Sequence, residues 1–287
     1  MNDHALKGIV LIALSALAFA LSTVFAKFVT TQSAISGIEI AFFRFAAGLA
    51  VIVPYMLARK KTFRAVEKRY VALRGVSNAV AVIFFYLGIQ FTTVTNANML
   101  NMTYPVFVYL MAPFINRERG SWRGWVSVAL TIAGSWLIMM PGFAAINAGD
   151  VFSLLSAVVA GVAVCALRES RKYDDSEVIL FHLMAIGTAV CLVATLPNFV
   201  VPQGMMIVHI ALTTLFALVG QVFITEGYRF IDAGPGALVS ASRVLFAGVL
   251  GAVVFADALT VNLVAGGALI MLSLAGVSLN GGRKEGD

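Results

Sequence analysis

Hydrophobic residues follow one another along this chain in runs too long for the interior of a soluble domain. Two stretches, 75–116 and 178–225, contain no Lys, Arg, Asp or Glu over 42 and 48 residues. A helix needs about 20 apolar residues to span a bilayer, so each stretch has room for two spans. We place the breaks at 92–96 and 197–204, where polar, Pro and Gly residues concentrate.

The same pattern predicts an all-α, polytopic membrane protein with ten transmembrane helices. The predicted spans are residues 8–30, 37–58, 71–91, 95–115, 122–141, 149–168, 177–197, 207–229, 234–255 and 260–280. The first apolar run is longer than the roughly 7–15 residues of a signal-peptide core, so we keep it as a helix. Composition agrees, because 60% of the residues are hydrophobic and 12% are charged, whereas soluble domains have about 25% charged residues.

The cations mark one side of this arrangement. Seventeen of the 20 Lys and Arg residues lie at helix ends that alternate crossing puts on a single side: Lys7, Arg59, Lys60, Lys61, Arg64, Lys68, Arg69, Arg74, Arg117, Arg119, Arg123, Arg168, Arg171, Lys172, Arg229, Arg283 and Lys284. The loops of the opposite side contain none. The positive-inside rule therefore predicts that both termini are cytoplasmic and that the chain lies in the cytoplasmic membrane. Since topology explains the net charge of +6, we expect no nucleic-acid partner.

The two halves of the chain resemble each other, helix by helix, at offsets of 138 to 142 residues. The equivalent pairs include Gly8 and Gly149, Ser15 and Ser156, Lys27 and Arg168, Glu39 and Glu177, Gly88 and Gly227, Thr103 and Ser242, Glu118 and Asp257, and Gly134 and Gly276. Because each half holds five helices, the second half, residues 148–287, crosses the membrane in the opposite sense to the first, residues 1–147. Secondary transporters use such inverted repeats to build two gates around a site at the midplane.

Several short motifs give the chain a family resemblance. They are the glycines Gly8 and Gly149 that open the halves, Phe43-Arg44-Phe45, Asn96-Ala97-Asn98-Met99-Leu100, Tyr104-Pro105, Arg117-Glu118-Arg119, and Pro235-Gly236-Ala237 followed by Arg243 and Asp257. With these motifs the chain resembles the drug/metabolite transporter superfamily, specifically its EamA-type ten-helix members, over essentially its whole length. The resemblance implies a secondary transporter that exports a small organic solute, such as an amino acid or a related metabolite, by alternating access. The halves differ at one level, where Arg243-Val244 stands opposite Tyr104-Pro105.

Ionisable groups inside a membrane cost about 2.5–3.5 kcal/mol each on insertion scales, so they mark candidate functional sites. Three cations lie away from the cation-rich ends: Lys27, Arg44 and Arg243. Arg243 is the strongest candidate for binding a substrate, because it lies near the bilayer centre with no acid close by in sequence. The alternative is a structural arginine that bonds to carbonyls or to a carboxylate. For Arg44, substrate binding and structural pairing both stay open, whereas Lys27 is near enough to the surface to snorkel.

Polar side chains on the fourth and ninth helices extend the candidate site. Tyr104 occupies the same level as Arg243, Asn98 and Asn101 precede it at intervals of three residues, and Ser240 lies beside Arg243. We predict that these residues contribute to substrate binding. The alternative is that small and amide side chains hold the helices together. Since an unpaired Arg243 would be costly, we also expect the substrate to carry a negative group.

A membrane channel or sensor is an alternative function, and an intramembrane enzyme is a weaker one. Enzymes need paired carboxylates, a metal cluster or an activated nucleophile, but His4, His182 and His209 are scattered along the chain. The nucleotide-binding pattern Gly-x-x-x-x-Gly-Lys is absent. We therefore expect no catalysis and no nucleotide, metal or other cofactor. If transport is coupled to protons, we expect Glu226 to be an interfacial ion-pair partner of Arg229 and not the proton carrier.

Overall fold

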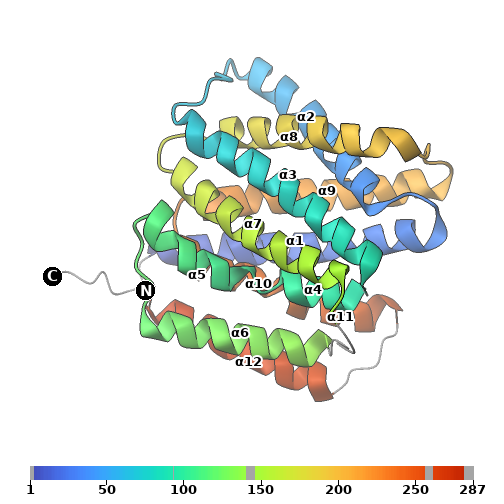
Figure 1. The fold of residues 1–287 in the computed structure, drawn as a ribbon. Coiled ribbons are helices and arrows are strands. Elements are labelled where there is room, and N and C mark those ends of the chain that lie inside the picture. The colour runs from blue at the N-terminus through green and yellow to red at the C-terminus, as the bar shows by residue number, and fades with distance from the viewer. Residues whose placement is uncertain (1–2, 93, 140–145, 256–260, 281–287) are drawn as a thin grey trace.

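The computed structural model describes residues 3–92, 94–139, 146–255 and 261–280, and these ranges are helical without strands (Figure 1). The helices are α1 (Asp3–Gln32), α2 (Gly37–Ala58), α3 (Lys68–Phe91), α4 (Val94–Asn101), α5 (Tyr104–Ile115), α6 (Trp122–Met139), α7 (Ala148–Ser170), α8 (Ser176–Thr195), α9 (Met205–Gly227), α10 (Ala233–Ala241), α11 (Arg243–Phe255) and α12 (Val261–Asn280). Among the described residues, seven helical segments are long and apolar enough to cross a membrane, judged by length and composition. The all-α, polytopic fold is confirmed.

Two predicted spans are wrong in one respect, because the fourth and the ninth are each broken near the middle. The fourth consists of α4 and α5, and the ninth consists of α10 and α11. Pro105, in the first turn of α5, has no N–H with which to continue the hydrogen-bond ladder of α4. At the second break, the N–H of Ser242 bonds to the carbonyl of Val239, three residues back, so the turn tightens there.

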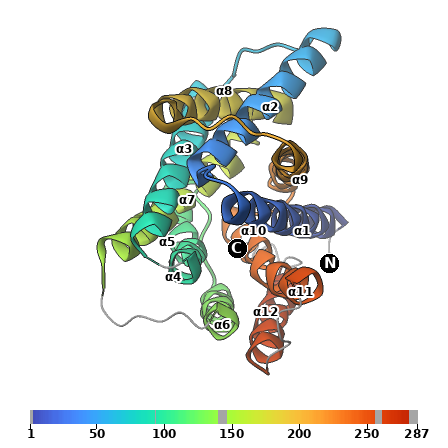
Figure 2. The same ribbon diagram turned by 90° about the vertical axis from the view of Figure 1, so that its right-hand side faces the viewer.

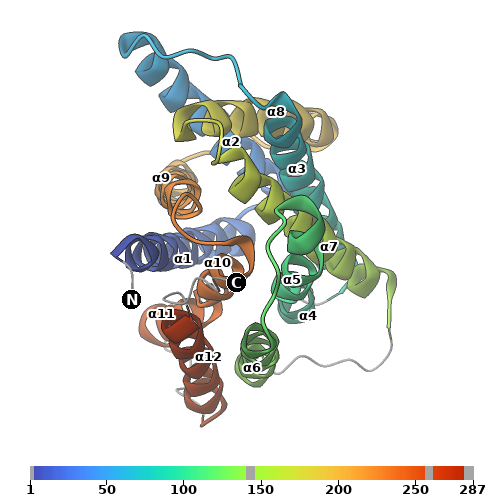
Figure 3. The same ribbon diagram turned by 90° about the vertical axis from the view of Figure 1, so that its left-hand side faces the viewer.

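Each of the four largest helix contacts joins a helix of the first half to a helix of the second half. α1 lies along α9 and α3 lies along α7, while α2 packs on α8 and α6 packs on α12 (Figure 2, Figure 3). The repeat relates α1 to α7 and α3 to α9, so the first two pairs are equivalent to each other. It also relates α2 to α8 and α6 to α12, so each of the other two pairs joins a helix to its own repeat partner. This is the pairing expected of a two-fold inverted repeat, so the repeat is a property of the packing as well as of the sequence.

Matched hydrogen bonds follow the same symmetry. The hydroxyl of Ser15 on α1 donates to the carbonyl of Gly220 on α9 at 2.7 Å. Its repeat partner, Ser156 on α7, donates to the carbonyl of Ala81 on α3 at 2.8 Å. Inside a membrane, small side chains let helices approach closely and bond across the interface. The equivalent serines therefore serve equivalent contacts in the two halves.

The contact between α6 and α12 brings equivalent residues together. The hydroxyl oxygens of Thr131 and Ser273, which are 142 residues apart, lie 2.8 Å from each other. One turn away, Gly134 faces Gly266 so closely that a Cβ on Gly266 would lie 2.5 Å from the Gly134 carbonyl oxygen. Glycine is required at this crossing because the two backbones leave no room for a side chain.

The start of α1 and the end of α12 lie at the same end of the bundle, as the topology predicts (Figure 1). Arg168 ties this end together. Its guanidinium donates to Glu118 at 2.9 Å, to Asp232 at 2.7 Å and to the carbonyl of Tyr228 at 3.0 Å. Burial raises the pKa of the Glu118 carboxyl and the nearby Asp232 charge raises it further, while the bond from Arg168 opposes both. One arginine thus joins the ends of α5, α7 and α9.

Glu226 also lies at this end. Its carboxylate forms an ion pair at 3.5 Å, but the partner is Arg171, directly after α7, so the predicted pairing with Arg229 is wrong. Glu39, at the opposite end, is buried and forms a capping box with Ser36. Its second carboxylate oxygen accepts the N–H of Val200 at 2.9 Å. These carboxylates hold the helix ends in place.

We predict that Gly266→Ala destabilises the protein, whereas Gly267→Ala does not. A Cβ at Gly266 would meet backbone atoms of α6, while a Cβ at Gly267 would meet only the tip of Leu245 at 2.8 Å. Overpacking of this kind costs about 1–3 kcal/mol, whereas alanine in place of glycine favours a helix by about 1 kcal/mol. Thermal unfolding of the two purified variants in detergent measures the difference. Equal melting temperatures for the two variants would contradict the close approach of α6 and α12.

Candidate functional site

The two helix breaks face each other inside the bundle. Tyr104 is the first residue of α5 and Arg243 is the first residue of α11, and the two are equivalent at an offset of 139 residues. The Tyr104 hydroxyl donates to the carbonyl of Ala237 on α10 at 3.0 Å and also bonds to the Ser240 side chain. Arg243 contacts the sulfur of Met102 at 3.8 Å. Each break is therefore in contact with side chains from the other broken helix.

This arrangement brings positive charge to one place. The N-terminus of a helix carries a partial positive charge, and here α5 and α11 both begin near the Arg243 guanidinium. A thioether such as that of Met102 is a weak acceptor, so it does not neutralise Arg243. The ion pairs among the described residues involve charged groups at the cation-rich end, and Arg243 is in none of them.

Arg44 enters the interior from α2. Its guanidinium lies over the rings of Phe45 and Phe19, at 5.2 and 5.5 Å from their centres, and reaches the Gln221 side chain at 3.5 Å. It is near enough to Arg243 for the two charges to repel each other. Arg44 is therefore close to the helix breaks, as the sequence-based site requires, and its contacts combine aromatic stacking with an amide.

The two asparagines of α4, Asn98 and Asn101, differ in their surroundings. Asn101 donates to the hydroxyl of Ser156 on α7 at 2.9 Å, and Ser156 in turn bonds to α3, so Asn101 takes part in a helix contact. Asn98 lies one turn earlier and is half-buried. The structure thus brings Arg243, Tyr104 and Ser240 together and adds Arg44, while Asn101 points toward α7.

Sequence reasoning missed Arg74, which it counted with the cations of the cytoplasmic ends. Arg74 lies two turns into α3 and is only 5% exposed. Its neighbours are the Tyr228 side chain, which is fully buried, and Arg44. The sequence carried a weak signal, since Arg74 is the cation furthest inside the third predicted span. Among the described residues, the interior therefore holds three arginines: Arg44, Arg74 and Arg243.

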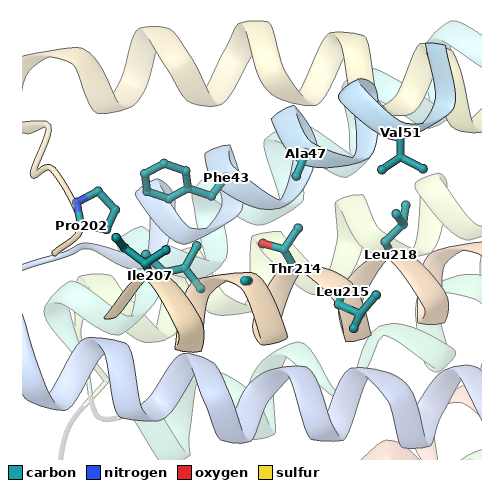
Figure 4. Close-up of a pocket in the computed structure, with 10 residues that line it drawn as sticks. Phe43, Ala47, Val51, Pro202, Ile207, Thr214, Leu215 and Leu218 are labelled. Carbon is teal, nitrogen blue, oxygen red and sulfur yellow. The ribbon is translucent and has the colours of Figure 1, made fainter. Parts of the chain in front are cut away.

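A separate apolar groove runs between α2 and α9 (Figure 4). Its volume is about 530 Å³, and its lining consists of Phe43, Ala47, Val51, Pro202, Ile207, Ile210, Ala211, Thr214, Leu215 and Leu218. Val51 and Leu215 are more than half exposed, so the groove opens at the outside of the bundle. Thr214 is the only polar side chain that lines this groove, whereas the helix breaks carry Arg243, Tyr104 and Ser240.

Comparison with known proteins agrees with this architecture. A model of the EamA-like transporter family matches the chain twice, at residues 6–140 and 147–279. A crystal structure that is 17% identical superposes with a TM-score of 0.81 over the whole of both chains, which shows the shared fold.

Three relatives are transporters or solute carriers by name. The human Solute carrier family 35 member G1 is 26% identical over 93% of this chain and 77% of its own length. The Pseudopaline exporter CntI of Pseudomonas aeruginosa is 25% identical over 96% of this chain and 97% of its own. The S-adenosylmethionine uptake transporter of Rickettsia prowazekii is 22% identical over 81% and 80%. Because the two family matches together cover most of the sequence, we conclude that the chain belongs to the EamA-like transporter family.

Proposed function

We propose that this membrane transporter exports a small organic solute, an amino acid or a related metabolite, by alternating access, and that Arg243 binds a negative group of that solute. The observation that carries the proposal is the position of Arg243 at the first residue of α11, opposite Tyr104 and without a carboxylate partner among the described residues. A bare cation inside a bilayer is costly, so a carboxylate on the solute would compensate it.

Broken helices support the same proposal. In secondary transporters, half-helix N-termini near the midplane commonly point at anionic substrate groups. Here α5 and α11 both begin at the level of Arg243, and the inverted repeat supplies the two gates that alternating access requires. The direction of export is proposed from the pseudopaline exporter, which aligns over nearly its whole length. The candidate solute site comprises Arg243, Tyr104, Ser240 and Arg44, with Asn98 and Asn101 on the neighbouring helix.

We predict that Arg243→Gln weakens solute binding and transport, and that Arg243→Lys weakens them less. Lysine keeps the charge but loses the planar fork that binds a carboxylate with two bonds. A hydrogen bond to a charged group contributes about 1.5–3 kcal/mol, so glutamine should lower the affinity about tenfold or more. Counter-flow of labelled solute in proteoliposomes measures the effect, and also separates a carrier from a channel.

The matched control is Arg69→Gln, which removes an exposed arginine from the first turn of α3. This variant should transport normally. Unchanged transport by Arg243→Gln, or a transported solute that is a simple cation, would show that Arg243 is structural.

We further propose that the cation-rich end faces the cytoplasm, with both termini on that side. A reporter enzyme fused after Asp287 that is active only outside the cytoplasm should therefore be inactive in cells, because the fusion point stays inside. The same reporter inserted between Val200 and Val201, in the loop between α8 and α9, should be active. The reverse pattern would overturn this orientation.

A further inference from the structure

Arg44 lies near the two other arginines of the interior. It is near enough to both Arg243 and Arg74 for its charge to repel theirs. Arg74 comes from α3 and Arg243 from α11, so the three guanidinium groups reach the interior from three different helices. Like charges that interact in the buried interior destabilise the fold unless something negative lies among them.

Arg44, Arg74 and their neighbours carry buried donors that lack a partner. The buried polar atoms without a hydrogen-bond partner include Nε of Arg74, Nε of Arg44, the amide nitrogen of Gln221 and the hydroxyl of Tyr228. Gln221 is 2% exposed and Tyr228 is fully buried. Buried polar groups are nearly always hydrogen-bonded, so each of these calls for an explanation. All four atoms donate hydrogen bonds, and the chemistry that satisfies a cluster of donors is an oxyanion.

Arg168, a structural arginine of this protein, has contacts of a different kind from those of Arg74. Arg168 is mostly buried too, but its guanidinium is paired with Glu118 and Asp232 and bonds to backbone carbonyls at the helix ends. Arg74 takes part in no ion pair among the described residues. This contrast favours a binding role for Arg74 over a purely structural one.

We propose that Arg74, Arg44, Gln221 and Tyr228 form a second anion-binding subsite beside Arg243, and that the transported solute is therefore a dianionic organic acid. One carboxylate binds Arg243 and Tyr104 at the helix breaks. The other binds Arg74 and Tyr228 between α3 and α9, with Arg44 between the two groups. This proposal rests on the proposed function, because it needs Arg243 to hold the first carboxylate.

The test compares two probes of equal carbon number, succinate with two carboxylates and butyrate with one. Binding to the purified protein is measured by titration calorimetry at neutral pH. The wild type should bind succinate at least about tenfold more tightly than butyrate, since each tenfold corresponds to about 1.4 kcal/mol. Arg74→Gln should bring this ratio close to one, because the second carboxylate of succinate loses its charged partner.

Matched variants make the outcome specific. Arg69→Gln removes an exposed cation from the same helix and should leave the ratio unchanged. Tyr228→Phe keeps the aromatic ring and removes only the unpartnered hydroxyl, so it should lower the ratio without unfolding the protein. It also serves in place of Arg74→Gln if that variant does not fold.

Three results would overturn the proposal. Equal affinities of the wild type for the two acids would exclude a second subsite. An unchanged ratio in Arg74→Gln, or in Tyr228→Phe if the former does not fold, would make Arg74 structural. If Arg243→Gln then still weakens both acids, the proposed function stands and only the second subsite fails. Absence of binding by either acid to the wild type would overturn the dianion proposal, while the proposed function is decided by the transport measurement on Arg243→Gln.

Discussion

A bilayer offers no water to polar groups, and this constraint governs every part of the molecule. It requires continuous helical hydrogen bonding wherever the chain meets lipid, so an interrupted helix is tolerable only where another part of the protein covers the interruption. The two interruptions here lie against each other, and the Tyr104 hydroxyl donates to the carbonyl of Ala237 on α10. The same constraint places most ionised groups at the ends of the bundle, where Arg168 gathers two carboxylates. The arginines of the interior are the exception, and the proposed function follows from them.

Much of the fold follows from the sequence, because the length of an apolar run and the placement of cations are local properties. All ten predicted spans correspond to helical segments, and the equivalent pairs Ser15 and Ser156 make equivalent contacts. The breaks could not be predicted in the same way. Pro105 is a local signal, but proline is tolerated inside transmembrane helices. The break before Arg243 has no proline or glycine beside it, so it depends on packing between distant segments.

The site was only partly predictable for the same reason. Arg243 stood out because no acid lies near it in sequence, and Tyr104 followed from the repeat. Arg74 did not stand out, because its neighbour Tyr228 is 154 residues further along the chain. Asn101 matched the helical spacing of a binding row, yet its side chain bonds to Ser156 on α7. Glu226 was assigned to the nearest cation in sequence, whereas its partner, Arg171, comes from another helix. In each case the residue type indicated a buried polar contact, but the sequence did not show which residue the partner is.

The central proposal is that the facing breaks form a positively charged site, which alternating access opens to each side of the membrane in turn. Reactivity of a single thiol at Ser240, beside Arg243 and Tyr104, measures this most directly. In a background with Cys165→Ala and Cys191→Ala, Ser240→Cys would be exposed to an anionic and to a cationic methanethiosulfonate reagent of similar size. A positive site predicts faster reaction with the anionic reagent, and slower reaction when the Arg243→Gln change is added. Faster reaction with the cationic reagent, or no reaction with either from both sides of the membrane, would contradict the account.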